Sequence, residues 1–184
     1  GFPEPVVGTV TSVPDNGEPL LNQLYLRAGR LIDPGRNDEI IISESFAKAH
    51  DFRPGDQLHV IIKGKRKQLR IVGTGGSPEF VHQLRPGGMF PDYERYGILW
   101  MGRTALSHAY DMQGAFNYAV LTLTRDADEK TVMDRIDALL GRYGGIGSFA
   151  REYQPSLRFL AQELEQLENL SGLFPIIFLG VAAF

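Results

Sequence analysis

The chain has 184 residues, a net charge of −3 and 43% hydrophobic residues, which is the composition of an ordinary globular protein. These values exclude a disordered chain and a polycation built to bind nucleic acid. The absence of cysteine excludes a thiol nucleophile, a cysteine-ligated zinc site and a disulfide framework. A chain of this length can bury a core that is stable without a metal or a disulfide.

The N-terminal residues predict a strand and then a strand-helix-turn unit. Residues 6–13 are β-branched and lie between two prolines, which favours a strand. A short apolar strand is expected at 39–42, and Ser43 is the N-cap candidate for a helix at 44–50. Residues 20–32 fit either element type.

A β-hairpin is the clearest element of the chain. Apolar and polar residues alternate through residues 57–62 and again after the turn, so one face of the hairpin is apolar. Its tip, "KGKRK", carries the four basic residues Lys63, Lys65, Arg66 and Lys67. Two interpretations stay open: contact with anionic phospholipid headgroups, or a solvated tip that protects the hairpin from pairing with other strands.

The stretch "GTGG" at 73–76 follows a strand, where a phosphate-binding loop would lie. It fits neither the dinucleotide-binding nor the Walker pattern, so we interpret it as a turn. A loop-rich segment follows, and then a buried strand at 96–101 and a short helix at 103–112 are expected.

From Phe116 the pattern becomes that of an α/β layer. Alternation predicts a strand at 116–124, and Gly144 and Gly145 are expected to end the amphipathic helix that follows it. The apolar stripe of this helix consists of Val132, Met133, Ile136, Leu139, Leu140 and Tyr143.

A second helix is predicted from Pro155 onward, with leucines at heptad spacing. This seam either packs on its own domain or pairs with another helix near a membrane; it consists of Leu157, Leu160, Leu164 and Leu167. The apolar residues 173–184 contain no charge, and at twelve residues they are shorter than the roughly 20 that a span needs. They predict either the start of a transmembrane helix or a buried C-terminal element.

No catalytic or metal site is visible in the sequence. The histidines have no metal-ligand spacing, and no nucleophile elbow is present; they are His50, His59, His82 and His108. A serine hydrolase that uses one of the last three histidines with a serine such as Ser77 remains one alternative. A second is a membrane-anchored module that binds a lipid or a peptide.

Two stretches carry a family resemblance: "LYLRAGRLIDPGRNDEIIISESFAKAHDFRPGDQLHVIIKGKRKQLRIVGTGGSPEF" and "REYQPSLRFLAQELEQLENLSGLFPIIFLGVAAF". They resemble the extracytoplasmic, MacB-like periplasmic core domain of FtsX-like permeases of ABC transporters. The pattern is a Gly29–Arg30 pair, an acidic residue before a strand and helix (Glu39 to Ala49), the Pro54-Gly55-Asp56 turn, a hairpin and "IVG". The two glycines suit turns, and Asp56 can cap one.

The resemblance implies an α+β fold with two lobes and a stalk. Residues 1–19 would begin an α/β lobe that is truncated at its N-terminus, and a mainly β lobe at 20–115 would be inserted into it. Residues 116–153 would return to the α/β lobe, 154–172 would form a stalk helix, and 173–184 would start a transmembrane helix.

The implied function is mechanical and not enzymatic. The domain would lie on the extracytoplasmic side of a bacterial cytoplasmic membrane and hold no cofactor or metal, because ATP would be bound by a separate cytoplasmic ABC ATPase. Its further partners would be a second permease copy, the membrane and, in a tripartite pump, a membrane-fusion protein. No loop for docking such a protein stands out in the sequence, and no nucleic-acid partner is expected.

Overall fold

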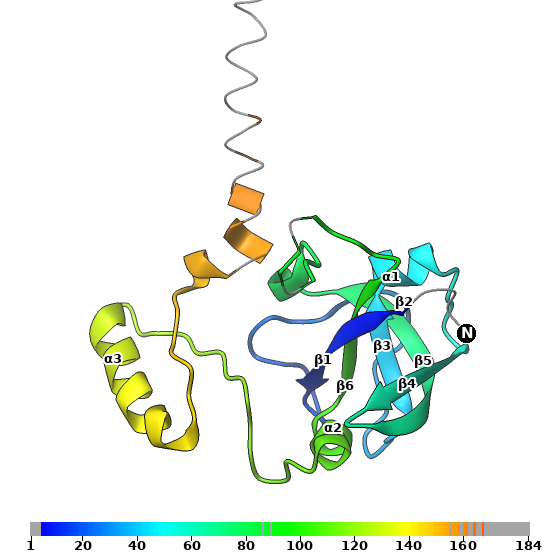
Figure 1. Ribbon diagram of the computed structural model, residues 1–184, viewed down its shortest axis with the longest axis horizontal. Coiled ribbons are helices and arrows are strands. Elements are labelled where there is room, and N and C mark those ends of the chain that lie inside the picture. Colours follow the sequence, from blue (N-terminus) through cyan, green and yellow to red (C-terminus); the bar gives the residue numbers. More distant parts are fainter. Residues whose placement is uncertain are drawn as a thin grey trace, which may run out of the picture. The chain divides into compact units, whose positions relative to one another are not determined.

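A computed structural model describes residues 5–85, 87, 88, 90–154, 156–158, 160, 161, 164 and 167. The chain divides into two compact units, Gly1–Leu121 and Thr122–Phe184. The first contains a six-stranded mixed sheet with two α-helices on it, so the predicted α+β class is confirmed (Figure 1). The second contains one longer α-helix and short helical turns.

The sheet has the strand order β1-β6-β3-β5-β2, and β4 also pairs with β5. Its strands are β1 (Val7–Val13), β2 (Tyr25–Gly29), β3 (Glu39–Ser43), β4 (Gln57–Ile62), β5 (Lys65–Gly76) and β6 (Tyr96–Gly102). β1 runs parallel to β6, and β3 runs parallel to β5. β1, which lies in the segment predicted to begin a separate α/β lobe, is therefore hydrogen-bonded into the same sheet as the other strands.

The long strand β5 organises this sheet. Along one edge its first half forms the predicted hairpin with β4 and its second half pairs with β2, while β3 pairs along the other edge. The hairpin turn consists of Lys63 and Gly64, whose φ angles of 49° and 75° match the right-handed twist of the strands. One strand thus holds three others in register.

Glycines in β5 allow β2 to come close. The prediction of a turn at these glycines is wrong. Residues 73–76 are not a turn but the end of β5. A Cβ atom on Gly73 would lie 2.6 Å from the carbonyl oxygen of Arg30, and one on Gly75 would lie 2.4 Å from that of Tyr25. The glycine-rich stretch is therefore explained by close backbone approach within a sheet.

Helices α1 (Glu44–Ala49) and α2 (Arg103–Tyr110) follow directly after β3 and β6. Ser43 occupies the N-cap position of α1, but its side chain does not cap the helix. Its hydroxyl instead donates a 2.7 Å hydrogen bond to Oε1 of Gln83, and both residues are buried. The predicted N-cap position is therefore confirmed, but the side chain bonds to Gln83, a buried acceptor forty residues away in the sequence, and not to the helix. For α2, Asp15 accepts bonds from the backbone and hydroxyl groups of Thr104.

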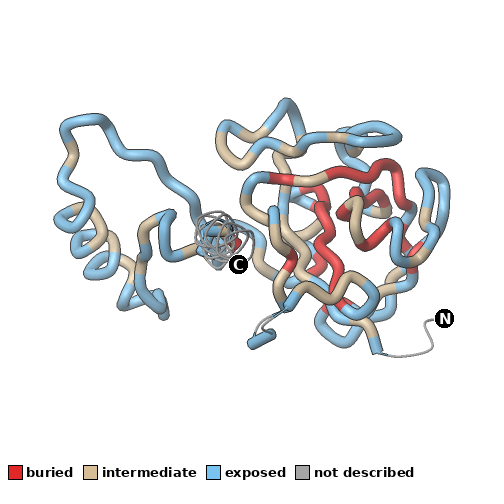
Figure 2. Tube along the Cα trace, turned by 90° about the horizontal axis from the view of Figure 1, so that it is seen from above, coloured by how far each residue is buried: buried red, intermediate tan, exposed pale blue. Residues whose placement is uncertain are grey.

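The sheet buries apolar residues on both faces, in two clusters. Figure 2 shows that the buried residues are concentrated in the first unit. Ile40, Ile42 and Leu99 belong to a core cluster that includes Phe46 and Ala47 of α1 and Ala105 of α2. A second cluster contains Ile41, Ile98 and Trp100, against which loop residues such as Phe80 pack. The odd-even alternation of β3 explains this division, since neighbouring side chains point to opposite faces.

The second unit contains α3 (Glu129–Leu140), where an amphipathic helix was predicted. Asp128 caps it by accepting a bond from the backbone N–H of Thr131. No residue of α3 is fully buried: of its apolar stripe, Val132, Met133, Ile136 and Leu140 are intermediate in exposure, whereas Leu139 is exposed. Residues 116–124 do not form the predicted strand, because none of the described strands pairs with them.

The described residues between 156 and 167 are helical, in the region of the predicted second helix. Helices of the described residues lack the combination of length and apolar character that crossing a membrane requires. The predicted span at 173–184 lies outside the described residues. The two-lobed arrangement with a stalk therefore stays a prediction.

Substitution of Gly75 by alanine is expected to destabilise the sheet unit by about 2 kcal/mol or more, because the added Cβ would collide with a backbone carbonyl that cannot move freely. Gly76→Ala is the matched control, since a Cβ there meets nothing within 4 Å, and it should change stability by less than about 1 kcal/mol. Urea unfolding followed by the fluorescence of Trp100, the sole tryptophan, measures both. Equal stability of the two variants would contradict the close approach.

Candidate functional site

An ion pair between the buried Glu39 and the partly exposed Arg30 joins residues that carry the family resemblance. Arg30, just after β2, donates two hydrogen bonds to Glu39 at the start of β3, with Nη1–Oε2 and Nη2–Oε1 distances of 2.9 and 2.7 Å. The backbone N–H of Asp33 also donates to Oε2, and Arg36 lies 3.5 Å from Oε1. Glu39 is only 2% exposed. The Arg30 bonds lower the pKa of Glu39 despite its burial, so the carboxylate is held in its charged form.

The glycines and the aspartate of the same pattern fasten loops to β5. Gly29 has a φ of +80°, and a Cβ there would lie 2.2 Å from the carbonyl oxygen of Val72. The N–H of Gly55, whose φ is +107°, donates to the Ile71 carbonyl, and the N–H of Ile71 donates back to Asp56. The side chain of Asp56 accepts from the N–H of Arg53 and caps this turn, as predicted. These residues therefore form one structural clamp around β5.

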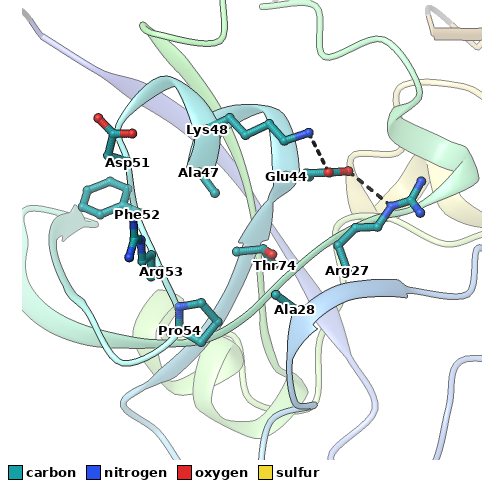
Figure 3. Close-up of a pocket in the computed structure, with 10 residues that line it drawn as sticks. All are labelled: Arg27, Ala28, Glu44, Ala47, Lys48, Asp51, Phe52, Arg53, Pro54 and Thr74. Carbon is teal, nitrogen blue, oxygen red and sulfur yellow. Dashed lines mark ion pairs between the residues drawn. The ribbon is translucent and has the colours of Figure 1, made fainter.

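A groove lies beside α1 in the first unit (Figure 3). Its volume is about 370 Å³, and its lining residues are Arg27, Ala28, Glu44, Ala47, Lys48, Asp51, Phe52, Arg53, Pro54 and Thr74. At the rim, Glu44 pairs with Lys48 at 2.8 Å and with Arg27 at 3.3 Å. Lys48 and then Arg27 lower the pKa of Glu44. Small and apolar side chains combined with this charged rim can provide a short ligand with both apolar contact and hydrogen bonds.

The sequence analysis missed this groove. The spacing of Glu44 and Lys48 on one helix face was a visible signal of an ion pair. No sequence signal marked Arg27 as part of the groove. This residue is the extra residue at a register shift in β2, between Leu26 and Ala28, and such a shift redirects a side chain. Only the pairing of β2 with β5 creates that shift.

The four basic residues of the hairpin tip differ in their contacts and in their exposure. Lys63 donates hydrogen bonds of 3.0 Å to the Tyr110 carbonyl and to the Asp111 carboxylate at the end of α2. This contact lowers the pKa of Asp111. Lys65 and Arg66 are exposed and Lys67 is half-buried. Contact of the tip with a membrane stays a prediction.

Ser77, the serine of the hydrolase alternative, makes other hydrogen bonds, and the histidines lie in separate places. The hydroxyl of Ser77 donates to the backbone carbonyl of Asn22, and it accepts from the N–H of Glu79 at the start of a short helical turn. His50 contacts the Glu94 carbonyl at 2.8 Å and the ring of Phe46. His59 and His108 lie on the exposed surface, and His82 is half-buried. In the described residues, no group of three His, Asp or Glu side chains converges on a metal position.

The predicted leucine seam lies on described helical residues. Leu157 and Leu160 are half-buried, whereas Leu164 and Leu167 are exposed. The exposed pair leaves open the predicted contact with another helix.

Replacement of Glu39 by glutamine is expected to destabilise the first unit by about 1–3 kcal/mol at neutral pH, because a buried charge-assisted contact is lost. The difference from the wild type should be complete above the ordinary glutamate pKa of 4.5 and shrink as the pH falls through the lowered pKa of Glu39. Protonation then removes the same charge from the wild type.

The matched control is Asp38→Asn, which breaks an exposed pair with Arg36 and should cost less than about 1 kcal/mol. Urea unfolding at a series of pH values measures the three proteins. A stability difference for Glu39→Gln that does not change with pH would argue against the charged pair.

Comparison with protein-family models, curated protein sequences and solved structures finds no match. A functional assignment therefore depends on the residues of this chain, and chiefly on the clamp formed by the motif residues around β5.

Proposed function

We propose that this chain is the extracytoplasmic domain of an FtsX-like permease, which couples ATP hydrolysis in the cytoplasm to export or extraction of a substrate outside the membrane. The observation that carries the proposal is the clamp. Gly29, Arg30 and Glu39, together with the Pro54-Gly55-Asp56 turn, follow the family pattern in order, and their contacts converge on β5. Motif residues that contact the same strand support the fold of the resembled family better than motif residues scattered over the structure would.

The proposed mechanism is transmission of displacement and not catalysis. The C-terminal helix, to which the described helical residues 156–158, 160, 161, 164 and 167 belong, would pass motion between the membrane and the domain, and the leucines at 164 and 167 would pair it with another helix. A domain that receives such motion must resist deformation. Three strands fastened to β5 and cores on both faces of the sheet supply that resistance in the first unit.

The proposed partners follow from this role. A cytoplasmic ABC ATPase would bind and hydrolyse the ATP, so this domain needs no cofactor of its own. A second permease copy would complete the transporter in the bacterial cytoplasmic membrane, and a membrane-fusion protein would be added only in a tripartite pump.

A second candidate function is a membrane-anchored module that binds a peptide or a lipid. The groove beside α1 favours it, because apolar residues such as Ala28 and Pro54 line the groove while paired charges form its rim. That combination suits a short peptide, which needs apolar contact along its side chains and polar contact along its backbone.

The extracytoplasmic location can be tested with a single cysteine, because the chain has none of its own. Leu20 is 95% exposed and offers a position that should tolerate the change. In intact cells that produce the full-length protein, a membrane-impermeant maleimide should label the Leu20→Cys variant but not the wild type. Labelling that requires lysis of the cells would refute the proposed location.

The mechanical role can be tested at Ala161, which lies exposed on the C-terminal helix. Ala161→Pro should break the helix, at about 3 kcal/mol relative to alanine, and abolish function in a strain that lacks the chromosomal gene. ATPase activity of the purified transporter should persist, because the nucleotide site is elsewhere. Ala161→Ser is the control that keeps the helix, and it should restore function. Full function of the proline variant would show that the helix only connects the domain to the membrane and does not transmit motion.

A further inference from the structure

The outer face of the β4–β5 hairpin combines positive charge with an exposed aliphatic side chain. Residues 57–72 contain five basic residues and no acidic residue. Ile61 is 75% exposed, and the strand register places it opposite Arg66. Its neighbours Leu58 and Ile62 are buried in the domain core, so Ile61 is the aliphatic residue of β4 that the fold turns outward.

The tip of this hairpin is braced against the body of the domain. Lys63 makes both of its bonds to the end of α2, so its charge is compensated by Asp111. No ion pair in the described part of the chain joins Lys65, Arg66 or Lys67 to a carboxylate. Arg66 lies on the face of Ile61, whereas Lys65 and Lys67 lie opposite Ile62 and Val60 on the other face, and Lys65 also lowers the pKa of Asp111. Three cations without an ion pair of their own therefore flank both faces of a turn whose position is held by Lys63.

The chemistry of the tip selects one kind of partner. A protein partner would require roughly 800 Å² of contact on each side, which is more than a two-residue turn and its flanks present. Single-stranded nucleic acid would be expected to use aromatic side chains for stacking, and residues 57–72 contain none. An anionic bilayer needs only cations at the depth of the phosphates and an apolar side chain that can enter the acyl boundary.

We propose that the β4–β5 hairpin docks on an anionic phospholipid surface through its turn end, with Lys65, Arg66 and Lys67 from its two faces at the phosphates and Ile61, beside Arg66, between the headgroups. This contact would fix the height of the sheet unit above a membrane. It does not depend on the transport function proposed above, since any protein held near a bilayer could use it.

The test places an environment-sensitive fluorophore on the cysteine of an Ile61→Cys variant of the whole chain, which has no competing thiol. The probe surface is a vesicle of phosphatidylcholine with about 30 mol% phosphatidylglycerol, and a vesicle of phosphatidylcholine alone is the comparison. A blue shift, and quenching by nitroxide-labelled acyl chains, are expected with the anionic vesicles only. Because the signal comes from position 61, attachment of the chain through another segment does not produce it.

Two variants control for charge and for general adsorption. Adding Lys65→Ser, Arg66→Ser and Lys67→Ser should abolish the shift, whereas Arg125→Ser, Lys130→Ser and Arg135→Ser remove the same charge from exposed positions elsewhere and should preserve it. The same fluorophore at Leu20→Cys, an exposed aliphatic position without basic neighbours, should give no shift. The fluorescence of Trp100 verifies that each variant is folded.

The results separate the proposal from its alternatives. A shift with anionic vesicles that disappears with the three hairpin cations supports docking through the tip. The proposal is overturned by the absence of a shift, by an equal shift on neutral vesicles, or by an equal response at Leu20→Cys. Failure of the maleimide experiment on location would leave these outcomes unaffected, so the two proposals can fail independently.

Discussion

The contact of Arg30 with the buried carboxylate of Glu39 is the constraint on which the first unit depends. A carboxylate that is 2% exposed would be costly without compensation, and here it accepts two bonds from a guanidinium and one from a backbone N–H. Because Glu39 begins β3 and Arg30 follows β2, the contact ties together two strands that lie on opposite sides of β5. A less polar pair could provide similar stability, but not the fixed bidentate geometry.

β5 is the element that this contact encloses. The strand has partners along both edges, and its glycines allow β2 and the residue after it to approach closely. A register shift on β3 and another on β2 adjust the pairing on the two sides. Strand pairing on both edges of β5 thus forms the centre of the unit. The groove beside α1 and the hairpin tip, the two surfaces proposed to bind partners, lie outside it.

The two peripheral surfaces suit different partners. In the groove, Arg27 and Lys48 already share Glu44, so their charges are largely internal to the protein. At the tip, Lys63 pairs with Asp111, and among the described residues no carboxylate forms an ion pair with Lys65, Arg66 or Lys67. Binding of a peptide in the groove and docking of the hairpin on a membrane would therefore not compete for the same side chains.

The sequence by itself indicated the α+β class, the strands β1, β3 and β6, the β4–β5 hairpin and the helices after β3 and β6, because hydrophobic periodicity is a local property. It left β2, within residues 20–32, undecided. It also indicated the turn capped by Asp56. It did not reveal the role of "GTGG", since only the approach of β2 explains those glycines, or the partner of Ser43, which lies forty residues away.

The strand expected at 116–124 marks the limit of this reasoning. Its alternation is a property of the residues, but a strand exists only where a neighbour completes its hydrogen bonds, and none of the described strands does so. The groove and the outward position of Ile61 were likewise decided by tertiary structure. Register and strand pairing, which involve residues far apart in the chain, determine which side chains meet and which remain exposed.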